Sequence, residues 1–229
     1  MPVSVLTDRS QILDAARRLA ARRLAPHRHP AKNWDGAHMV ERIVAELGDR
    51  RREAAILDVG CQWCPMLRWL ASLGFRRLYG IDAMAVEPWW TRVSERLRGW
   101  RIDRSVQDLQ QTTFPDATFS AVTSLSVIEH GVDPDRYAVE MARIIRPGGL
   151  LLTSTDYWPD GVDTSGIYPY GPQFGEMRVF DRTGLETLLA TLDRRGFELG
   201  NDVSLEAAEP LVTWRGRSYT FVLIEARRR

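Results

Sequence analysis

Hydrophobic residues recur with two different periods along the chain. Near the N-terminus, apolar positions repeat every three or four residues over 10–25 and again over 37–48, which predicts two amphipathic helices. The stretch between them, 26–36, is rich in proline, histidine and polar residues and is predicted to be a loop.

From residue 55 onward, short apolar runs alternate with helical patterns. The alternation predicts an α/β fold, with a mostly parallel sheet covered by helices on both faces. The predicted strands are 55–60, 77–82, 104–109, 119–126 and 149–156, separated by helices near 65–73, 85–99 and 133–145. A helix capped by Asp181 and running to about Arg195 comes next, followed by strands near 197–206 and 218–226.

The length of 229 residues and the hydrophobic content of 44% suit a single domain with its own core. Four parts are predicted along it. They are a helical N-terminal extension (1–53), a ligand-binding core (54–156), a loop rich in Tyr, Pro and Gly (157–180) and a C-terminal helix with strands (181–229). Loops as long as the third part tend to be functional.

The charge balance argues against large charged partners. The formal net charge is +1, so no global field attracts nucleic acid or anionic lipid. There is no apolar run of membrane-spanning length, no signal-peptide pattern, and two cysteines make no disulfide framework. We therefore expect a cytoplasmic protein with no membrane partner. An arginine cluster at 17–23 leaves an RNA-binding alternative open.

Polar residues gather where the predicted strands end, and ligands of open α/β sheets bind beyond those ends. Asp82 lies 22 residues after Gly60. An acid at about that distance from a glycine turn holds the ribose of a nucleotide. At the next strand end, Asp108 is placed to accept from an adenine amino group, and the Leu109 amide to meet a ring nitrogen. Polar residues at four successive strand ends together indicate a nucleotide site.

The order ILDVGC, YGID, VQDL, FPDATFSAVTSLSVIEH and RIIRPGGLLLTSTD resembles the class I S-adenosylmethionine-dependent methyltransferases. The small-molecule, type 11-like branch is the most similar, and the match covers about 54–156. The resemblance implies a Rossmann-like, seven-stranded sheet whose last strand is antiparallel. It also implies S-adenosylmethionine as the cofactor and S-adenosylhomocysteine as the product.

The resemblance also implies a role for each strand end. Asp58 and Gly60 would frame the methionine part of the cofactor, Asp82 would hold the ribose and Asp108 the adenine. The full predicted cofactor set is Asp58, Gly60, Cys61, Gln62, Asp82, Ala83, Asp108, Leu109 and Ser126. The family usually shows DxGxGxG, whereas here the run is DVGCQWC. Gln62 and Cys64 replace two glycines, which leaves open a domain that binds without catalysing.

Other chemistries fit the same residues less well. Cys61 and Cys64 form a CxxC before a helix, as in thioredoxin-like sites, but the tryptophan lies between them rather than before them. Two packed thiols are the preferred interpretation. No metal site is predicted, because His27, His29 and His38 lie in a different segment. A dehydrogenase would need the GxGxxG motif, which is missing.

Methyl transfer to a hydroxyl needs a base, and His130 is the best-placed candidate, with Tyr157 as the second. Glu129 is expected to be structural. Aromatic residues of the following loop are predicted to cover and stack on the acceptor: Trp158, Tyr168, Tyr170 and Phe174. The N-terminal helices would close over the site, with Trp34 and His38 at its entrance.

The sequence therefore predicts methyl transfer to oxygen or nitrogen of a small metabolite, such as a sugar or an intermediate of natural-product biosynthesis. Nucleic acid is not favoured as a partner, and the oligomeric state is open. RNA methyltransferase activity and an inactive methyltransferase-fold binding protein remain as alternatives.

Overall fold

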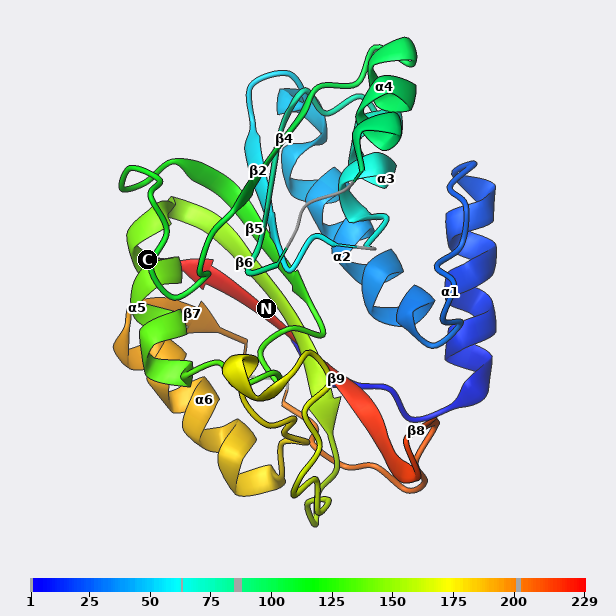
Figure 1. The fold of residues 1–229 in the computed structure, drawn as a ribbon, viewed down its shortest axis with the longest axis vertical. Helices are drawn as coiled ribbons and strands as arrows, with labels where there is room; N and C mark the ends of the chain where they lie inside the picture. The colour runs from blue at the N-terminus through cyan, green and yellow to red at the C-terminus, as the bar shows by residue number, and fades with distance from the viewer. Residues whose placement is uncertain (1, 63, 85–87, 201–202) are drawn as a thin grey trace.

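A computed structural model describes residues 2–62, 64–84, 88–200 and 203–229. Within them, nine strands form one sheet in the order β1-β9-β6-β5-β2-β3-β4, with β7 and β8 also pairing with β9 (Figure 1). The strands are β1 (Val3–Val5), β2 (Ala55–Val59), β3 (Arg77–Asp82), β4 (Ile102–Val106), β5 (Phe119–Leu125), β6 (Ile145–Tyr157), β7 (Phe197–Leu199), β8 (Val212–Trp214) and β9 (Arg217–Arg228).

The pairing confirms the predicted fold class. Strands β2 to β6 are parallel to one another, and β9 runs antiparallel to β6. The sheet has two strands beyond the expected seven, because β1 and β8 were not predicted. Each is three residues long, too short to leave a period in the sequence. β1 joins the sheet by pairing with residues 222–224, at the far end of the chain.

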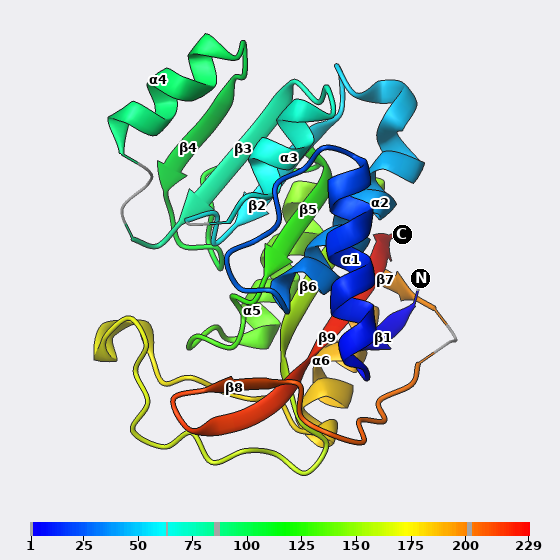
Figure 2. The same cartoon turned by 90° about the vertical axis from the view of Figure 1, so that its right-hand side faces the viewer.

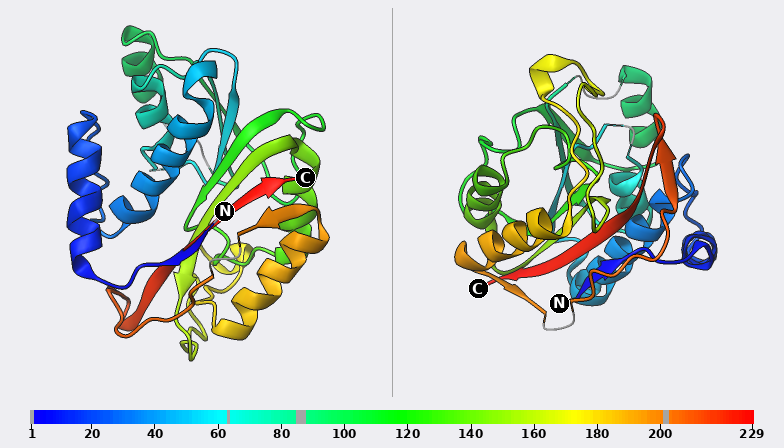
Figure 3. Two further views of the ribbon diagram at one scale, coloured as in Figure 1. Left: turned by 180° about the vertical axis from the view of Figure 1, so that it is seen from behind. Right: turned by 90° about the horizontal axis from the view of Figure 1, so that it is seen from below.

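Helices cover both faces of the sheet (Figures 1 and 3). One face carries α1 (Arg9–Ala21), α2 (Lys32–Leu47) and α3 (Met66–Ser72), and the other carries α5 (Pro134–Ile144) and α6 (Arg182–Arg194). α4 (Trp89–Leu97) lies beside the edge strand β4 (Figure 2). Alternate residues of a strand face opposite sides, so Leu150 and Leu152 enter the first core and Leu151 enters the second.

Two helix boundaries near the N-terminus differ from the prediction by four or five residues. α1 ends at Ala21, four residues early, because Arg23 adopts a φ of +60° and the Leu24 amide returns to Leu19 O. α2 begins at Lys32, inside the predicted loop. Its first turns bury Asn33, whose side-chain oxygen accepts from the His27 amide at 2.8 Å. Burial and this local bond outweigh the polar composition of the stretch.

The C-terminal half follows the prediction more closely. Asp181 caps α6, as expected, by accepting from the Gly184 amide at 2.6 Å. Of the predicted strand 197–206, the first three residues form β7 and Val203 makes an isolated bridge to Val3, while 201–202 lie outside the described residues. None of the helices in the described residues is both long and apolar enough to cross a bilayer.

Candidate functional site

A cavity of about 1060 Å³ lies at the carboxyl ends of the parallel strands. Its wall comes from these strand ends, from the 27–32 segment before and at the start of α2, and from the 169–177 loop. Most of the predicted residues line it: Gly60, Gln62, Asp82, Ala83, Asp108, Leu109, Ser126, His130, Tyr170 and Phe174. Parallel strands thus bring together side chains that are far apart in the sequence.

The turn after β2 closes without the two missing glycines. Gly60 has a φ of +70°, and a Cβ there would lie 2.3 Å from a methyl of Val127, so no other residue fits. The Gly60 and Cys61 amides both donate to Ile81 O, at 2.8 and 3.1 Å. The Gln62 amide donates to Asp82 Oδ2 at 3.2 Å. Gln62 therefore takes part in the turn instead of breaking it.

The Asp82 carboxylate is held at the mouth of this turn. Its other oxygen accepts from the Met84 amide at 2.9 Å. A carboxylate has about four acceptor positions, and bonds from the described residues use two of them. This is the arrangement a pair of ribose hydroxyls requires.

Two of the predicted cofactor residues lie behind the cavity wall rather than in it. Asp58 is 1% exposed and accepts from Thr123 Oγ1 at 2.6 Å, while burial raises the pKa of its carboxyl to about 7. Cys61 is buried against Gly80, where a Cβ would lie 2.7 Å from its sulfur. Both residues shape the turn from beneath, and their side chains do not reach the cavity.

The cysteine pair does not have the chemistry of a redox site. Both thiols are buried. Burial, helped by the negative charge of Asp58, raises the pKa of the Cys64 thiol well above its ordinary value. A redox cysteine needs a lowered pKa and access to solvent, so the packed-thiol interpretation is supported.

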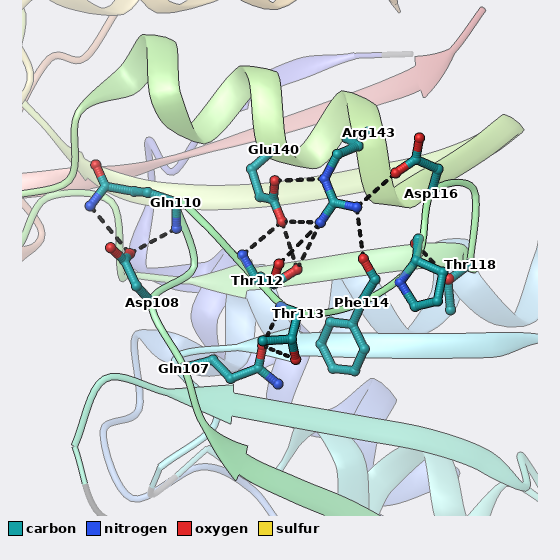
Figure 4. A network of polar contacts seen from close by, with 11 residues as sticks. Gln107, Asp108, Gln110, Thr112, Thr113, Phe114, Asp116, Thr118, Glu140 and Arg143 are labelled. Atoms are coloured by element: carbon teal, nitrogen blue, oxygen red, sulfur yellow. Dashed lines mark hydrogen bonds and ion pairs between the residues drawn. The ribbon is translucent and has the colours of Figure 1, made fainter.

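A polar network fixes the segment after β4, which carries Asp108 and Leu109 (Figure 4). Glu140 of α5 accepts from the Thr112 amide at 2.8 Å and from its hydroxyl at 2.6 Å. Arg143 donates to Glu140, to Phe114 O at 2.7 Å and to Asp116 at 2.8 Å. Burial alone would raise the pKa of Glu140, but the bonds from Arg143 and Thr112 lower it.

Three buried polar atoms around the cavity have no hydrogen-bond partner among the described residues. They are Gln62 Oε1, Ser126 Oγ and His130 Nδ1. Buried polar atoms are nearly always bonded in native proteins. Ser126 also adopts a φ of +52°, a strained conformation for a side chain of its type. These atoms fit a polar ligand that carries amine and hydroxyl groups.

A second group of ionisable residues lies at the other end of the cavity, under α2. Glu129 and Asp156 line the cavity with Lys32, whose Nζ lies 3.7 Å from the centre of the Phe221 ring. Behind them, Asp35 is fully buried and accepts from Ser154 Oγ at 2.8 Å. Sequence reasoning missed Asp35 and Lys32 because they fall in the stretch predicted to be a loop.

Comparisons with known proteins agree with this arrangement. A sequence profile described as "Methyltransferase domain" matches residues 57–153. The chain is 33% identical over 101 residues to a ubiquinone biosynthesis O-methyltransferase of Maricaulis maris, covering 44% of this chain and 39% of that one. It is 29% identical over 148 residues to a probable S-adenosylmethionine-dependent methyltransferase of Mycolicibacterium smegmatis, covering 65% and 55%.

The fold is likewise shared with solved structures. The structure of geranyl diphosphate methyltransferase in complex with SAM superposes with a TM-score of 0.62 at 18% identity, covering 89% of this chain and 96% of that one. Residues 57–153 are therefore similar to a methyltransferase domain, and the chain shares the fold of a solved methyltransferase. It spans 39 to 55% of the length of the two curated relatives.

The loop after β6 crosses over His130. His130 and Met177 form an isolated β-bridge, and a Cβ on Gly131 would lie 2.2 Å from Phe174 O. Tyr170 packs edge-on against the His130 ring with centroids 4.9 Å apart. Tyr170 and Phe174 therefore lie where the predicted acceptor-covering residues were expected.

Two other predicted acceptor residues lie elsewhere. Trp158 packs against the core on the face of the sheet that carries α1, α2 and α3, and Tyr168 is 40% exposed and does not line the cavity. Of the predicted aromatic set, only half faces the cavity. The backbone of the loop is folded on itself, as in the bond from the Met177 amide to Ile167 O, and this folding decides which rings turn inward.

Tyr157 was predicted as a catalytic candidate, and the structure contradicts that. Its ring is fully buried in the core under α5 and α6, and its hydroxyl donates to Leu205 O at 2.8 Å. Successive strand residues face opposite sides. Because Asp156 faces the cavity, Tyr157 must face away from it.

The entrance residues also differ from the expectation. Trp34 is 2% exposed, and with His38 it lines a separate, smaller hollow against α1. The segment from His27 to Lys32 lines the main cavity instead. In the described parts of the chain no group of three or more His, Cys, Asp or Glu side chains could hold a metal ion.

The ionisable residues under α2 have shifted pKa values. Burial, followed by repulsion from Glu129, raises the pKa of Asp156 to about 8. Burial raises the pKa of Glu129 to about 7, although the hydrogen bond from Thr155 at 3.1 Å acts to lower it. Burial lowers the pKa of His130 to about 4. Near neutral pH, His130 is thus uncharged, and Glu129 and Asp156 together hold at least one proton.

Proposed function

We propose that this protein binds S-adenosylmethionine in the cavity and transfers its methyl group to an oxygen or nitrogen of a small metabolite. The observation that carries the proposal is the Gly60 turn joined to the Asp82 carboxylate, which lines the cavity and accepts one backbone bond on each oxygen from the described residues. At about 1060 Å³, the cavity is at the upper end of the range for small-molecule sites. A cofactor and a small acceptor fit together in that volume.

The residues divide into a cofactor end and an acceptor end. Asp82 would bind the ribose, the Asp108–Leu109 segment the adenine, and Ser126 with Gln62 the amino-acid part. The bound cofactor supplies an electrophilic methyl group, so the protein must mainly align the acceptor behind it and exclude water. Tyr170 and Phe174 would cover the acceptor.

A hydroxyl acceptor must lose its proton as the new bond forms. The pKa values of about 7 and about 8 for Glu129 and Asp156 leave the pair holding roughly one proton at slightly alkaline pH. The ionised member would accept the proton, and a nearly neutral pKa suits that task. His130 would orient the hydroxyl through Nδ1, since its lowered pKa makes it the weaker base.

The substrate class rests on the acceptor end and on the relatives. The two relatives named for their substrates, a ubiquinone biosynthesis O-methyltransferase and geranyl diphosphate methyltransferase, support a small acceptor. We favour a hydroxylated ring or sugar of natural-product type, because aromatic rings lie beside the carboxyl pair. A net charge of only +1 gives little attraction for a nucleic-acid backbone, which weakens the RNA alternative.

One structural neighbour is named for a reaction other than methyl transfer. The [4+2]-cyclase SpnF superposes with a TM-score of 0.58 at 19% identity over 98% of both chains. A shared fold does not fix the reaction. The proposal of methyl transfer therefore depends on the site, and a cytoplasmic location remains part of the proposal.

Thermal unfolding with saturating S-adenosylhomocysteine tests the cofactor site, with NAD as the control ligand. A ligand at about 100 times its dissociation constant adds roughly 2.7 kcal/mol to the free energy of unfolding. Asp82→Asn should remove most of this shift, and Asp103→Asn, an exposed acid on β4, should retain it. A shift with NAD alone would overturn the proposal.

The transfer itself is tested with S-adenosylmethionine and pooled hydroxylated or aminated metabolites. A product one methyl group heavier should form together with S-adenosylhomocysteine. RNA serves as the control acceptor, and methylation of RNA alone would favour the alternative substrate class. Cofactor binding without turnover on any acceptor would favour the inactive binding protein.

A further inference from the structure

α4 is amphipathic, but its apolar face is exposed to solvent instead of packing against the protein. A surface helix normally buries its apolar face. Here Glu95 is the buried residue, whereas Trp89, Val93 and Leu97 are 71%, 44% and 84% exposed. These three residues are spaced by four and form one stripe along the helix. Trp90, 59% exposed, widens the stripe at its start.

An ion pair holds the helix in this orientation. Glu95 accepts two hydrogen bonds from Arg104 of β4, both at 2.8 Å, and the two side chains are only 4% and 2% exposed. Rotating α4 to bury its tryptophans would break this pair and leave a charge unpaired in the interior, which is strongly unfavourable. The outward direction of the apolar stripe is therefore built into the fold.

Basic residues surround the exposed stripe. Arg92, Arg96, Arg98 and Arg101 are all exposed, and the one acid of the helix is used in the buried pair. α4 lies at the end of the molecule next to the edge strand β4 (Figure 2). The surface thus combines two tryptophans, aliphatic side chains and positive charge on one projecting helix.

We propose that α4 docks this protein on an anionic lipid surface. Tryptophan sits at the level of lipid headgroups, and arginines beside an apolar stripe bind negatively charged lipids. A second copy of the chain suits the surface poorly, because pairing α4 with itself would bring the arginines together. The nine residues of α4 make a peripheral contact. The proposal revises the expectation of no membrane partner, which rested on the missing membrane-spanning run.

Vesicle sedimentation tests the proposal without any measurement of methyl transfer. The protein should bind vesicles of phosphatidylcholine with one part in three phosphatidylglycerol, and much more weakly vesicles of phosphatidylcholine alone. Arg92→Gln with Arg96→Gln should lower the partition coefficient about fivefold for each charge removed. Higher salt should weaken binding in the same direction.

Matched variants separate the apolar and the charged contributions. Trp89→Ala with Trp90→Ala, and Leu97→Glu, should abolish most binding without changing the midpoint of thermal unfolding, because these side chains are exposed. Leu13→Ala and Arg17→Gln, exposed on α1, are the controls and should bind as the parent does. Failure of the parent to bind anionic vesicles at low salt would overturn the proposal. A dimer that Leu97→Glu converts to a monomer would assign the surface to a second copy and overturn it too.

Discussion

The buried carboxyl of Asp156 makes a direct prediction about stability and pH. Its pKa is raised from 3.8 to about 8, chiefly by burial and then by Glu129. The folded protein therefore holds this proton more tightly than the unfolded chain does. The stabilisation is fully present below about pH 4 and is lost as the pH rises toward 8.

The magnitude follows from the difference in bound protons. Between pH 5 and 7, Asp156 is ionised in the unfolded chain and protonated in the folded protein. Its titration therefore lowers the free energy of unfolding by about 1.4 kcal/mol for each unit of rising pH. Asp156→Asn removes this titration. From pH 5 to pH 7, the free energy of unfolding of the variant should thus rise by about 3 kcal/mol relative to that of the parent.

Urea unfolding at intervals from pH 5 to 8 measures this difference. Asp103→Asn is the control, since Asp103 is exposed, and its curve should run parallel to that of the parent. If the Asp156→Asn and parent curves are also parallel, Asp156 does not hold a proton in the folded state. The assignment of the carboxyl pair as the proton acceptor would then fail as well.

Three further predictions concern the turn, the core tyrosine and the network after β4. Gly60→Ala and Gly99→Ala should each lose about 1–3 kcal/mol of stability, because both glycines have a positive φ. Gly60→Ala should lose more, because its Cβ would also meet Val127, and it alone should abolish the stabilisation by S-adenosylhomocysteine; equal losses in thermal unfolding would contradict this. Tyr157→Phe should lose about 1 kcal/mol of stability by urea unfolding with an unchanged methyl-transfer rate, and a large fall in rate would restore a catalytic role. Arg143→Ala should lower the free energy of unfolding by about 1–3 kcal/mol, because it removes the ion-pair partner of the nearly buried Glu140. Arg143→Lys should recover only part of that stability. No loss in Arg143→Ala would mean that the network is dispensable.

The local pattern of the sequence was enough to predict the layered architecture. Strand and helix periods are properties of neighbouring residues, so the parallel strands and the capped α6 could be found from them. The strand-end acids Asp82 and Asp108 were predicted to share a site, and both line the cavity. This succeeded because the carboxyl ends of parallel strands meet at one edge of the sheet whatever lies between them.

Other features depend on contacts between distant segments, which no local pattern contains. The direction of Tyr157 follows from which face of β6 packs on which helices. The packing under α2 joins Asp35 to Glu129 and Asp156, and their pKa shifts arise from the burial that this packing produces. The period of α4 predicted a helix in its region, but only the bond between Glu95 and Arg104 decided that its apolar face looks outward. The sequence by itself determined the elements and their order, while the tertiary structure decided which face of each element is buried, because burial depends on what packs against it.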